Sequence, residues 1–233
     1  MQDKDEPFAR EGFFRARTPA ALRRYVKGTR ERIAANSEWR KAARVGSGLY
    51  KRFREELIPF SHYCTWKYDD REDVRCRLIE GTRGGDGIVA EGDPQREHCI
   101  EITCPIDGKW DARQRRLINE EGCSDVEIWD TKDISLQSAA VARVIKAAHK
   151  KASRDYGLSG GSTLILVLNM TLHWSNIPEH RQLFARLIGE LSRIPMHVDE
   201  VLLMTFFGEE VKIFPVEYVP RGTGAGLRGY QRD

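Results

Sequence analysis

The sequence GGDGIVAEGDPQREHCIEIT, residues 84–103, contains two short apolar runs separated by a polar turn with a proline. Its alternation of apolar and polar residues and its turn residues predict a β-hairpin. Asp86 opens the first run and Glu101 lies inside the second, so the hairpin brings two carboxylates together at one end of a sheet. Carboxylates held in this way can bind a divalent metal ion, and such an ion can support the hydrolysis of phosphodiester bonds.

The second strand of this hairpin directs its side chains alternately to two faces. Cys99, Glu101 and Thr103 share one face, and the two intervening isoleucines share the other. A glutamate among apolar residues is costly unless it is paired or ligated. Two explanations remain open for Glu101: a bound metal ion, or an ion pair with an arginine of the N-terminal helices. Asp86 is likewise either a metal ligand or a turn residue between glycines.

The rest of the chain alternates between helical and extended patterns. Apolar spacing, capping residues and proline positions predict helices over residues 19–35, 37–58, 110–118, 136–157 and 178–194. We expect Thr18 to cap the first of these helices, Gly46 and Gly48 to break the second, and Pro59 to end it. Extended patterns predict strands over residues 62–68, 74–80, 88–90, 98–103, 126–130, 162–170, 198–206 and 209–216. The near-continuous apolar run at 162–170 is typical of a strand buried on both faces. This order predicts an α/β fold with a mixed central sheet flanked by helices on both faces.

Length and composition predict a globular protein with one main domain. At 233 residues, of which 40% are hydrophobic, the chain can bury a sizeable core. We expect a basic helical segment at 1–44, a main α/β domain at 45–220 and a flexible tail at 221–233. The N-terminus shows no basic-then-apolar signal pattern, and the longest apolar run is too short to cross a bilayer. We therefore expect a cytoplasmic protein that does not associate with a membrane.

Charge is distributed unevenly along the chain, although the net charge is only +3. Residues 1–60 hold 15 basic and 8 acidic side chains, whereas residues 61–135 hold 11 and 18. This pattern fits a phosphate-binding surface beside a metal centre, and it equally fits basic helices that lie against the chain's own acidic loops. On the first interpretation, the side chains that contact nucleic acid are Arg23, Arg24, Arg40, Lys41, Arg44, Lys51 and Arg52.

The five cysteines are irregularly spaced and include no CxxC pair. A disulfide framework is not expected in such a chain, and buried free thiols are the simpler interpretation. Zinc remains an alternative, because His98, Cys99 and Cys104 lie close together in the sequence. The sequence has no glycine-rich phosphate loop, HExxH motif or GxSxG motif, so none of the enzyme classes defined by those motifs is indicated.

Together these features resemble the restriction-endonuclease-like superfamily, the PD-(D/E)xK nucleases, over about residues 45–220. The core of that family consists of a helix, three antiparallel strands, a helix and a strand, which is similar to the order expected here. The segment Gly85-Asp86-Gly87 resembles the family's Pro-Asp element, with glycine in place of proline. The segment Glu101-Ile102-Thr103 resembles the Glu-x-Lys element, with threonine in place of lysine. Glu55 or Glu56 is similar to the extra acid that many members carry on the first core helix.

The resemblance implies a metal-dependent nuclease that acts on DNA or RNA. Asp86, Glu101 and Glu56 would then hold Mg²⁺ or Mn²⁺, and Thr103 would position the attacking water. The missing positive charge would come from Lys109, just past the strand, or from Lys146, on the following helix.

The alternative is a catalytically inactive relative that binds nucleic acid or a protein partner, including a second copy in a homodimer. The two possibilities differ in whether a lysine amine reaches the centre formed by Asp86 and Glu101. A third interpretation, an unrelated α/β protein that uses its cysteines, requires Cys99 and Cys104 to converge with His98.

Overall fold

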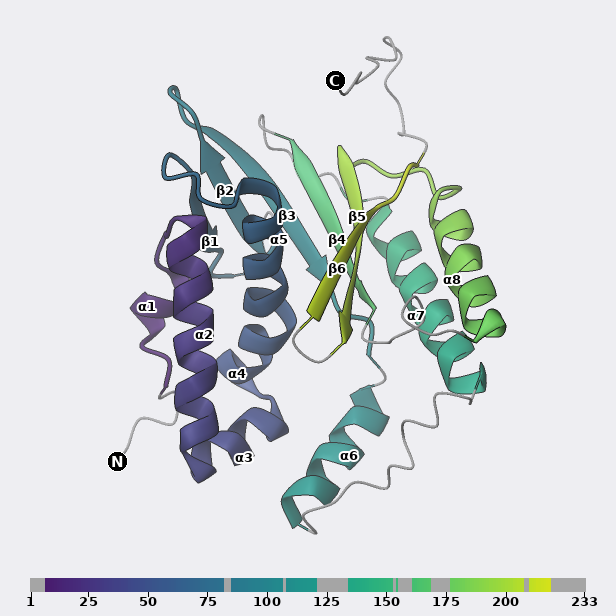
Figure 1. The fold of residues 1–233 in the computed structure, drawn as a ribbon, viewed down its shortest axis with the longest axis horizontal. Coiled ribbons are helices and arrows are strands. Elements are labelled where there is room, and N and C mark those ends of the chain that lie inside the picture. Colours follow the sequence, from purple (N-terminus) through teal and green to yellow (C-terminus); the bar gives the residue numbers. More distant parts are fainter. Residues whose placement is uncertain are drawn as a thin grey trace.

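The computed structural model describes residues 7–81, 85–106, 108–120, 134–152, 154, 161–168, 177–207 and 210–218. In these residues the chain is an α/β protein with a six-stranded mixed sheet and flanking helices (Figure 1). The helical elements are α1 Arg10–Phe14, α2 Pro19–Ala35, α3 Ser37–Val45, α4 Gly48–Arg52, the π-helical turn η1 Phe53–Leu57, α5 Ile58–Tyr68, α6 Gly108–Glu120, α7 Ile134–Ala152 and α8 Pro178–Leu191. The strands are β1 Arg75–Leu78, β2 Gly87–Glu91, β3 Arg96–Thr103, β4 Ser162–Leu168, β5 Glu200–Phe207 and β6 Glu210–Pro215.

The sheet follows the order of the sequence, from β1 at one edge to β6 at the other. Strands β1, β2 and β3 are antiparallel neighbours, β3, β4 and β5 run parallel, and β6 returns antiparallel to β5. The hairpin predicted at 84–103 is confirmed as β2 and β3. Every residue of β4 is buried, which confirms the expectation for the apolar run at 162–170.

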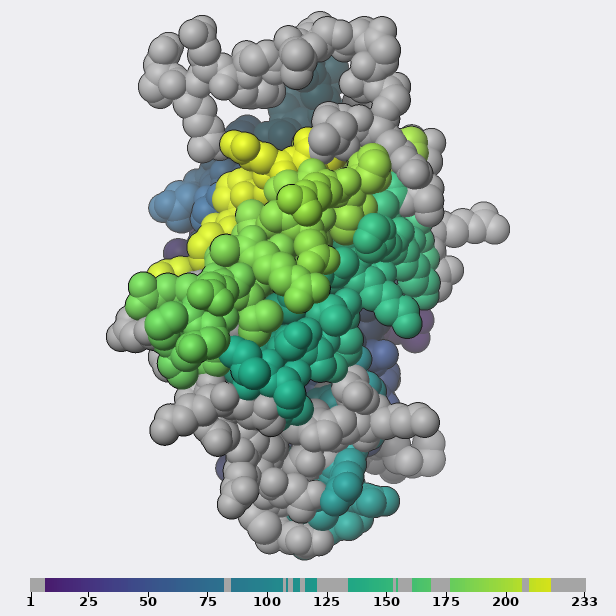
Figure 2. All heavy atoms as spheres, turned by 90° about the vertical axis from the view of Figure 1, so that its right-hand side faces the viewer, coloured from purple at the N-terminus to yellow at the C-terminus, as the bar shows by residue number. Residues whose placement is uncertain are grey.

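Two hydrophobic layers cover opposite faces of the sheet. On one face Ile100, Ile165 and Leu202 pack with residues of α2 and α5. On the other face Leu164 and Leu203 pack with α7 and α8, which lie side by side in Figure 2. Because successive residues of a strand point to opposite faces, the apolar run of β4 contributes to both layers.

The N-terminal helices follow the sequence closely. Thr18 caps α2 as predicted, and its hydroxyl accepts a hydrogen bond from the amide of Ala21 at 3.3 Å. Gly46 adopts a left-handed conformation with φ of 63° and ends α3, which confirms the predicted break at this position. Phe8 and Phe13 are buried in the layer that contains α2 and α5.

The strand predicted at residues 62–68 is wrong, because this segment lies in helix α5. Its aromatic residues are typical of an extended strand, but in the structure they pack into the core from one face of a helix. Phe60, Tyr63 and Cys64 are all fully buried there, and they show the three- and four-residue spacing of one helical side. Tertiary packing therefore overrides the β-propensity of these residues.

The expectation that Pro59 ends the preceding helix is also wrong, because Pro59 lies in the first turn of α5. Proline has no amide hydrogen to donate to the carbonyl of Glu55, four residues earlier. That oxygen accepts a hydrogen bond from the thiol of Cys104 at 3.1 Å. The π-helical turn η1 and this thiol accommodate the proline within a helical run that extends from α4 into α5.

The remaining predicted elements divide into those that the structure describes and those that it does not. The helices expected at 110–118 and 178–194 are confirmed as α6 and α8. The strand predicted at 126–130 and the tail at 221–233 lie outside the described residues. Within the described part of the chain, no helix combines the length and the apolarity needed to cross a membrane.

Replacing Ile165 by alanine should destabilise the fold strongly, because this side chain is fully buried in β4. We expect the free energy of unfolding to fall by about 2–5 kcal/mol, from lost apolar burial and from the cavity left behind. Ile134→Ala at the start of α7 is the matched control, because Ile134 is 40% exposed; its effect should stay below about 1 kcal/mol. Urea unfolding followed by circular dichroism measures both variants, and equal losses would contradict this account of the core.

Candidate functional site

The candidate site begins with two carboxylates that face each other across β2 and β3. The pair Gly87–Ile100 is in register, and the amide of Asp86 donates to the carbonyl of Ile100 at 2.9 Å. This register sets Asp86 opposite Glu101 on the same face of the sheet. The Oδ2 atom of Asp86 accepts a hydrogen bond from the amide of Ile102 at 2.7 Å, which fixes its carboxyl group against β3. The meeting of the two carboxylates expected from the hairpin is therefore present.

The close approach of Asp86 to β3 depends on the glycine that precedes it. Gly85 has φ of 93°, in the left-handed region that favours glycine. A Cβ atom at this position would lie 2.5 Å from the sulfur of Cys99 and 3.0 Å from the carbonyl oxygen of Ile100. Any larger residue would push the start of β2 away from β3 and move Asp86 with it.

Glu101 is the most deeply buried acidic residue of the site, with its side chain 4% exposed. Its Oε1 atom forms an ion pair with Nζ of Lys151, in the last turn of α7, and lies 3.4 Å from Nη1 of Arg154. These cations come from the C-terminal end of α7, whereas an arginine of the N-terminal helices was the alternative considered from the sequence. The buried negative charge of Glu101 is thus compensated by Lys151 and by Arg154, which follows the last residue of α7 by two positions.

The pKa of Asp86 is raised from its ordinary value of 3.8 to about 7, and burial is the largest cause. The negative charge of Glu101 acts in the same direction, and so, to a smaller extent, does that of Glu56. The hydrogen bond from Ile102 and the charge of Lys151 oppose these effects. Three carboxylates and one lysine therefore lie close enough to influence one another.

Glu56 reaches this group from η1 and has a cationic partner of its own. Its Oε2 atom accepts a hydrogen bond from Nε of Arg52 at 2.6 Å. The same guanidinium donates to the carbonyl of Ile79 at 2.9 Å, just before the loop that carries Asp86. Arg52, predicted as a nucleic-acid contact, thus joins η1 to the end of β1.

The Thr103 hydroxyl shares the face of Glu101, as the strand alternation predicted. Its oxygen is buried and has no hydrogen-bond partner within the described part of the chain. A hydroxyl carries one donor and two acceptor positions, so this hydrogen-bonding capacity is unused among the described residues. The position that resembles the family lysine therefore holds a buried hydroxyl on the same face of β3 as Glu101.

Lys109 and Lys146 are the two lysines predicted to supply positive charge at the carboxylates. Lys109 lies in the first turn of α6, and its side chain is outside the described residues. Lys146 is exposed and lines a cavity of about 330 Å³ between α7 and α8, together with His149, Arg186 and Glu190. The amine that reaches Glu101 belongs to Lys151, on the same helix as Lys146.

Sequence reasoning missed Lys151, although one signal could have indicated it. In a right-handed crossover, the helix between two parallel strands ends near the start of the second strand. Residues at the end of α7 therefore lie next to the beginning of β4, and Leu164 of β4 is in register with Glu101. The basic pair Lys150-Lys151 closes α7, so one of these lysines is well placed to reach Glu101.

The predicted nucleic-acid contacts lie on three different helices. Arg23 and Arg24 are exposed on α2. The exposed residues of α3 include Arg40, Lys41 and Arg44, with Lys41 3.3 Å from the carboxylate of Glu38. Lys51 is exposed on α4, with its amine 3.9 Å from the carboxylate of Glu55.

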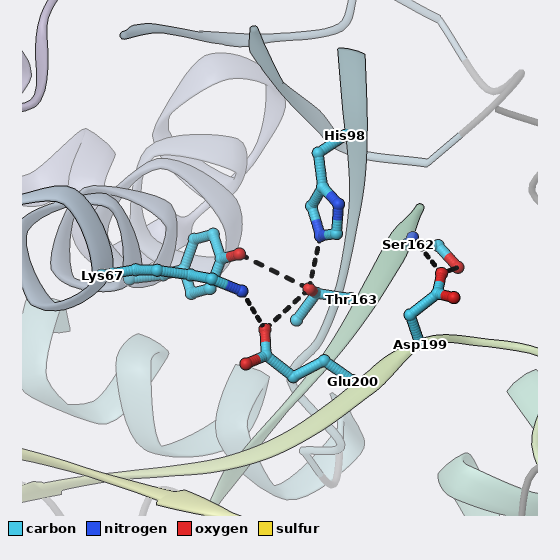
Figure 3. A network of polar contacts seen from close by, with 7 residues as sticks. Lys67, His98, Ser162, Thr163, Asp199 and Glu200 are labelled. Atoms are coloured by element: carbon cyan, nitrogen blue, oxygen red, sulfur yellow. Dashed lines mark hydrogen bonds and ion pairs between the residues drawn. The ribbon is translucent and has the colours of Figure 1, made fainter. Parts of the chain in front are cut away.

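A second polar cluster lies on the opposite face of the sheet, around the hydroxyl of Thr163 (Figure 3). That hydroxyl donates to Oε2 of Glu200 at 2.9 Å and contacts Nε2 of His98 at 2.7 Å and the Tyr63 hydroxyl at 3.4 Å. Lys67 of α5 donates to the same Glu200 oxygen at 2.7 Å. Thr163 is fully buried, so its hydroxyl joins α5, β3 and β5 to β4 from inside the fold, whereas the Lys67–Glu200 pair at the edge of the network is partly exposed.

The donor set at Asp86 and Glu101 fits a hard divalent cation. No group of three or more His, Cys, Asp or Glu side chains among the described residues is arranged to hold a metal ion. Mg²⁺, however, is commonly bound by one or two carboxylates and keeps several waters. The zinc alternative lacks the convergence it requires, because His98 contacts Thr163 on one face of β3 and Cys99 packs in the layer on the other.

Removing the amine of Lys151 should destabilise the fold, because Glu101 would keep a buried charge with only Arg154 nearby. We expect Lys151→Met to lower the free energy of unfolding by about 3 kcal/mol. Lys150→Met is the matched control, since Lys150 is an exposed neighbour in the same turn, and it should cost less than about 0.5 kcal/mol. Chemical denaturation at neutral pH compares them, and an equal effect of both substitutions would exclude a structural pairing of Lys151 with Glu101.

The free energy of unfolding should also depend on whether the carboxyl group of Asp86 is protonated. Its pKa is raised in the folded state, so its contribution to stability is complete below the unfolded value of 3.8 and is lost as pH rises through about 7. Asp86→Asn keeps an oxygen acceptor for the amide of Ile102 and removes the titration. Relative to this variant, the wild type should lose about 2–4 kcal/mol between pH 4 and pH 8.

Denaturant unfolding at several pH values measures this difference. The same substitution at exposed Asp70, in the turn after α5, provides the control. A constant difference between the wild type and Asp86→Asn across this pH range would contradict the raised pKa of Asp86.

The site thus combines two facing carboxylates, a third carboxylate from η1, a lysine and an arginine from the end of α7, and a buried hydroxyl. Such a set can bind a divalent cation together with the oxygens of an anionic substrate. Comparison of the chain with protein-family models, with curated proteins and with solved structures found no match.

Proposed function

We propose that this protein is a metal-dependent nuclease of the restriction-endonuclease-like type, which hydrolyses phosphodiester bonds of DNA or RNA. The observation that carries the proposal is the contact of Lys151 with Glu101, directly opposite Asp86. A lysine amine beside two facing carboxylates supplies the positive charge that Thr103 lacks. The order of α5, three antiparallel strands, α7 and β4, with α6 as an additional helix between β3 and α7, supports the same fold type.

Asp86 and Glu101 are the residues that would hold Mg²⁺ or Mn²⁺, while Glu56, paired with Arg52, would add negative charge beside them. When bound there, the metal ion polarises the phosphate and lowers the pKa of the attacking water. Asp86 must lose its proton to act as a ligand. Because the pKa of Asp86 is about 7, we expect metal affinity to rise with pH through the neutral range.

Lys151 and Thr103 prepare the site for an anionic substrate. The Lys151 amine neutralises Glu101 and remains within reach of a phosphate oxygen that approaches the same carboxylate. The buried Thr103 hydroxyl, which has no partner among the described residues, is positioned to orient a water by a hydrogen bond. Arg154 is half exposed and adds a second positive charge at the edge of the site.

A second candidate function is binding without catalysis. The observation that favours it is the pairing of Glu101 with Lys151 and Arg154, which satisfies the buried carboxylate without a metal ion. In that case the fold would bind nucleic acid or a protein partner, and the pair would act only in stability.

A cleavage assay with Mg²⁺ and with Mn²⁺ on duplex DNA, single-stranded DNA and RNA tests the first proposal. Glu101→Gln removes one ligand charge, and we expect it to lower the cleavage rate at least about 100-fold. The matched control is Glu97→Gln on the same strand, because the Glu97 side chain is 45% exposed and is paired with surface Arg77. It should leave the rate within about twofold of the wild type.

Cleavage that survives Glu101→Gln would refute the assignment of the site. An absence of cleavage of all three substrates, with metal binding also undetectable by calorimetry, would favour the second candidate function.

A further inference from the structure

Helices α3 and α6 are in contact with each other, at the bottom of Figure 1, and both carry more basic than acidic residues. The side chain of Asn119 in α6 accepts a hydrogen bond from Arg44 at 3.5 Å and donates to the carbonyl of Lys41 at 3.4 Å. We propose that this α3–α6 surface binds the phosphate backbone of duplex nucleic acid and directs it to the carboxylate site. The proposal rests on the nuclease function inferred above for that site.

The charge of the two helices fits a polyanion. In α3 there are three basic residues against one acidic residue, and in α6 four against two. Arg40 and Lys41 lie four and three residues before Arg44, so both are neighbours of Arg44 on the surface of α3. Arg113 and Arg116, spaced by three residues, are exposed along α6. Lys41 is 58% exposed, although its amine lies 3.3 Å from the carboxylate of Glu38. Arg116 is 67% exposed and lies 4.0 Å from Glu120.

A chain of contacts links this surface to the carboxylate site. Helix α6 begins five residues after Thr103, the last residue of β3. Arg54 of η1 lies 3.7 Å from Asp111 of α6, and Glu56 lies two residues further along η1. A backbone held by α3 and α6 therefore passes next to the element that contributes Glu56 to the site.

The arrangement favours a nucleic acid over an acidic protein. Packed helices lie about 8–10 Å apart, so α3 and α6 present two neighbouring rows of long cationic side chains. Two such rows match the closely spaced phosphates of a duplex, which carries one charge for about every 1.7 Å of its axis. An acidic protein presents its charges at irregular spacing and usually requires apolar contacts as well.

Helix α2 provides a stringent comparison, because it is also basic. It holds five basic residues and one acidic residue, and Arg23, Arg24, Lys27 and Arg30 are exposed on it. Its packing partners are α5, α3 and β1, so its outer side has no comparable contact with η1 or α6 among the described elements. Removing charge from α2 therefore tests for a general electrostatic effect, and removing it from α3 and α6 tests for the surface itself.

The experiment measures binding of a fluorescein-labelled 20-base-pair DNA duplex by anisotropy, without divalent metal so that no cleavage occurs. The variant Arg40→Gln/Lys41→Gln/Arg113→Gln/Arg116→Gln removes four charges from the α3–α6 surface. We expect it to weaken binding at least about tenfold and to reduce the slope of log K against log salt by up to about 3.6. The control Lys27→Gln/Arg30→Gln/Arg32→Gln removes three charges from exposed positions of α2 that are not among the predicted nucleic-acid contacts, and it should weaken binding less than about threefold.

A second variant distinguishes loss of charge from loss of folding as the cause of weaker binding. Arg40→Lys/Arg113→Lys/Arg116→Lys retains all charges and should bind the duplex within about threefold of the wild type, because phosphate contacts need charge more than a fixed geometry. If the wild type fails to bind the duplex, if the α2 control weakens binding as much as the α3–α6 variant, or if polyglutamate competes as well as unlabelled duplex, the proposal is overturned.

Failure of the proposed surface and failure of the proposed nuclease function can be told apart. Duplex binding is measured without metal and in Glu101→Gln as well as in the wild type. Binding that depends on α3 and α6 in a protein that cleaves no substrate would support the surface while refuting the nuclease. Cleavage that is unaffected by the α3–α6 substitutions would refute the surface while leaving the nuclease in place.

Discussion

The buried carboxylate of Glu101 is the constraint around which this part of the structure is arranged. A charge placed between β2, β4 and α7 must be compensated, since a carboxylate without a partner in such surroundings costs several kcal/mol. The compensation comes from the end of α7, which must therefore dock with Lys151 and Arg154 directed at β3. One side chain on the third strand thus helps to determine the position of the helix that covers that face of the sheet.

The negative charge of Asp86 is compensated in a different way. It lies opposite Glu101, but Lys151 is held by Glu101, and the main direct contact of Asp86 is the amide of Ile102. Burial and the neighbouring carboxylates raise its pKa to about 7, so a proton can replace the missing cation. Two facing carboxylates are thereby tolerated in one layer because one is neutralised by a lysine and the other by a proton. Gly85 makes this proximity possible by allowing the chain to lie against β3.

Much of the fold could be predicted from local patterns in the sequence. The Thr18 cap, the break at Gly46 and the apolar run of β4 are each determined by their own residues, and all three predictions hold. Segment 62–68 could not be predicted in this way, because its aromatic residues suit a strand as well as a buried helical face. The carbonyl of Glu55 that Pro59 leaves without an amide donor is paired with the thiol of Cys104, which is distant in sequence.

The site shows the same division between local and distant information. The alternation of β3 was sufficient to set Glu101 and Thr103 on one face and to expect a partner for the glutamate. Which cation fills that role depends on how far α7 extends along the sheet, a property of the tertiary packing. Lys146 and Lys151 lie on one helix, but a separation of five residues rotates them by more than a quarter turn and moves them about 7.5 Å along the axis. Of these two lysines, only Lys151 forms an ion pair with Glu101 of β3.

The balance of charge at the site connects its stability with the proposed chemistry. With a proton on Asp86 and Lys151 on Glu101, the facing pair carries no uncompensated negative charge. A divalent cation bound to both carboxylates would replace the proton and would weaken the hold of Glu101 on Lys151 and Arg154. The two cationic side chains could then turn to a phosphate at the same edge of β3, where the Thr103 hydroxyl also lies. Under the proposed function, the contact that stabilises the resting site is thus also the source of the charge that the substrate needs.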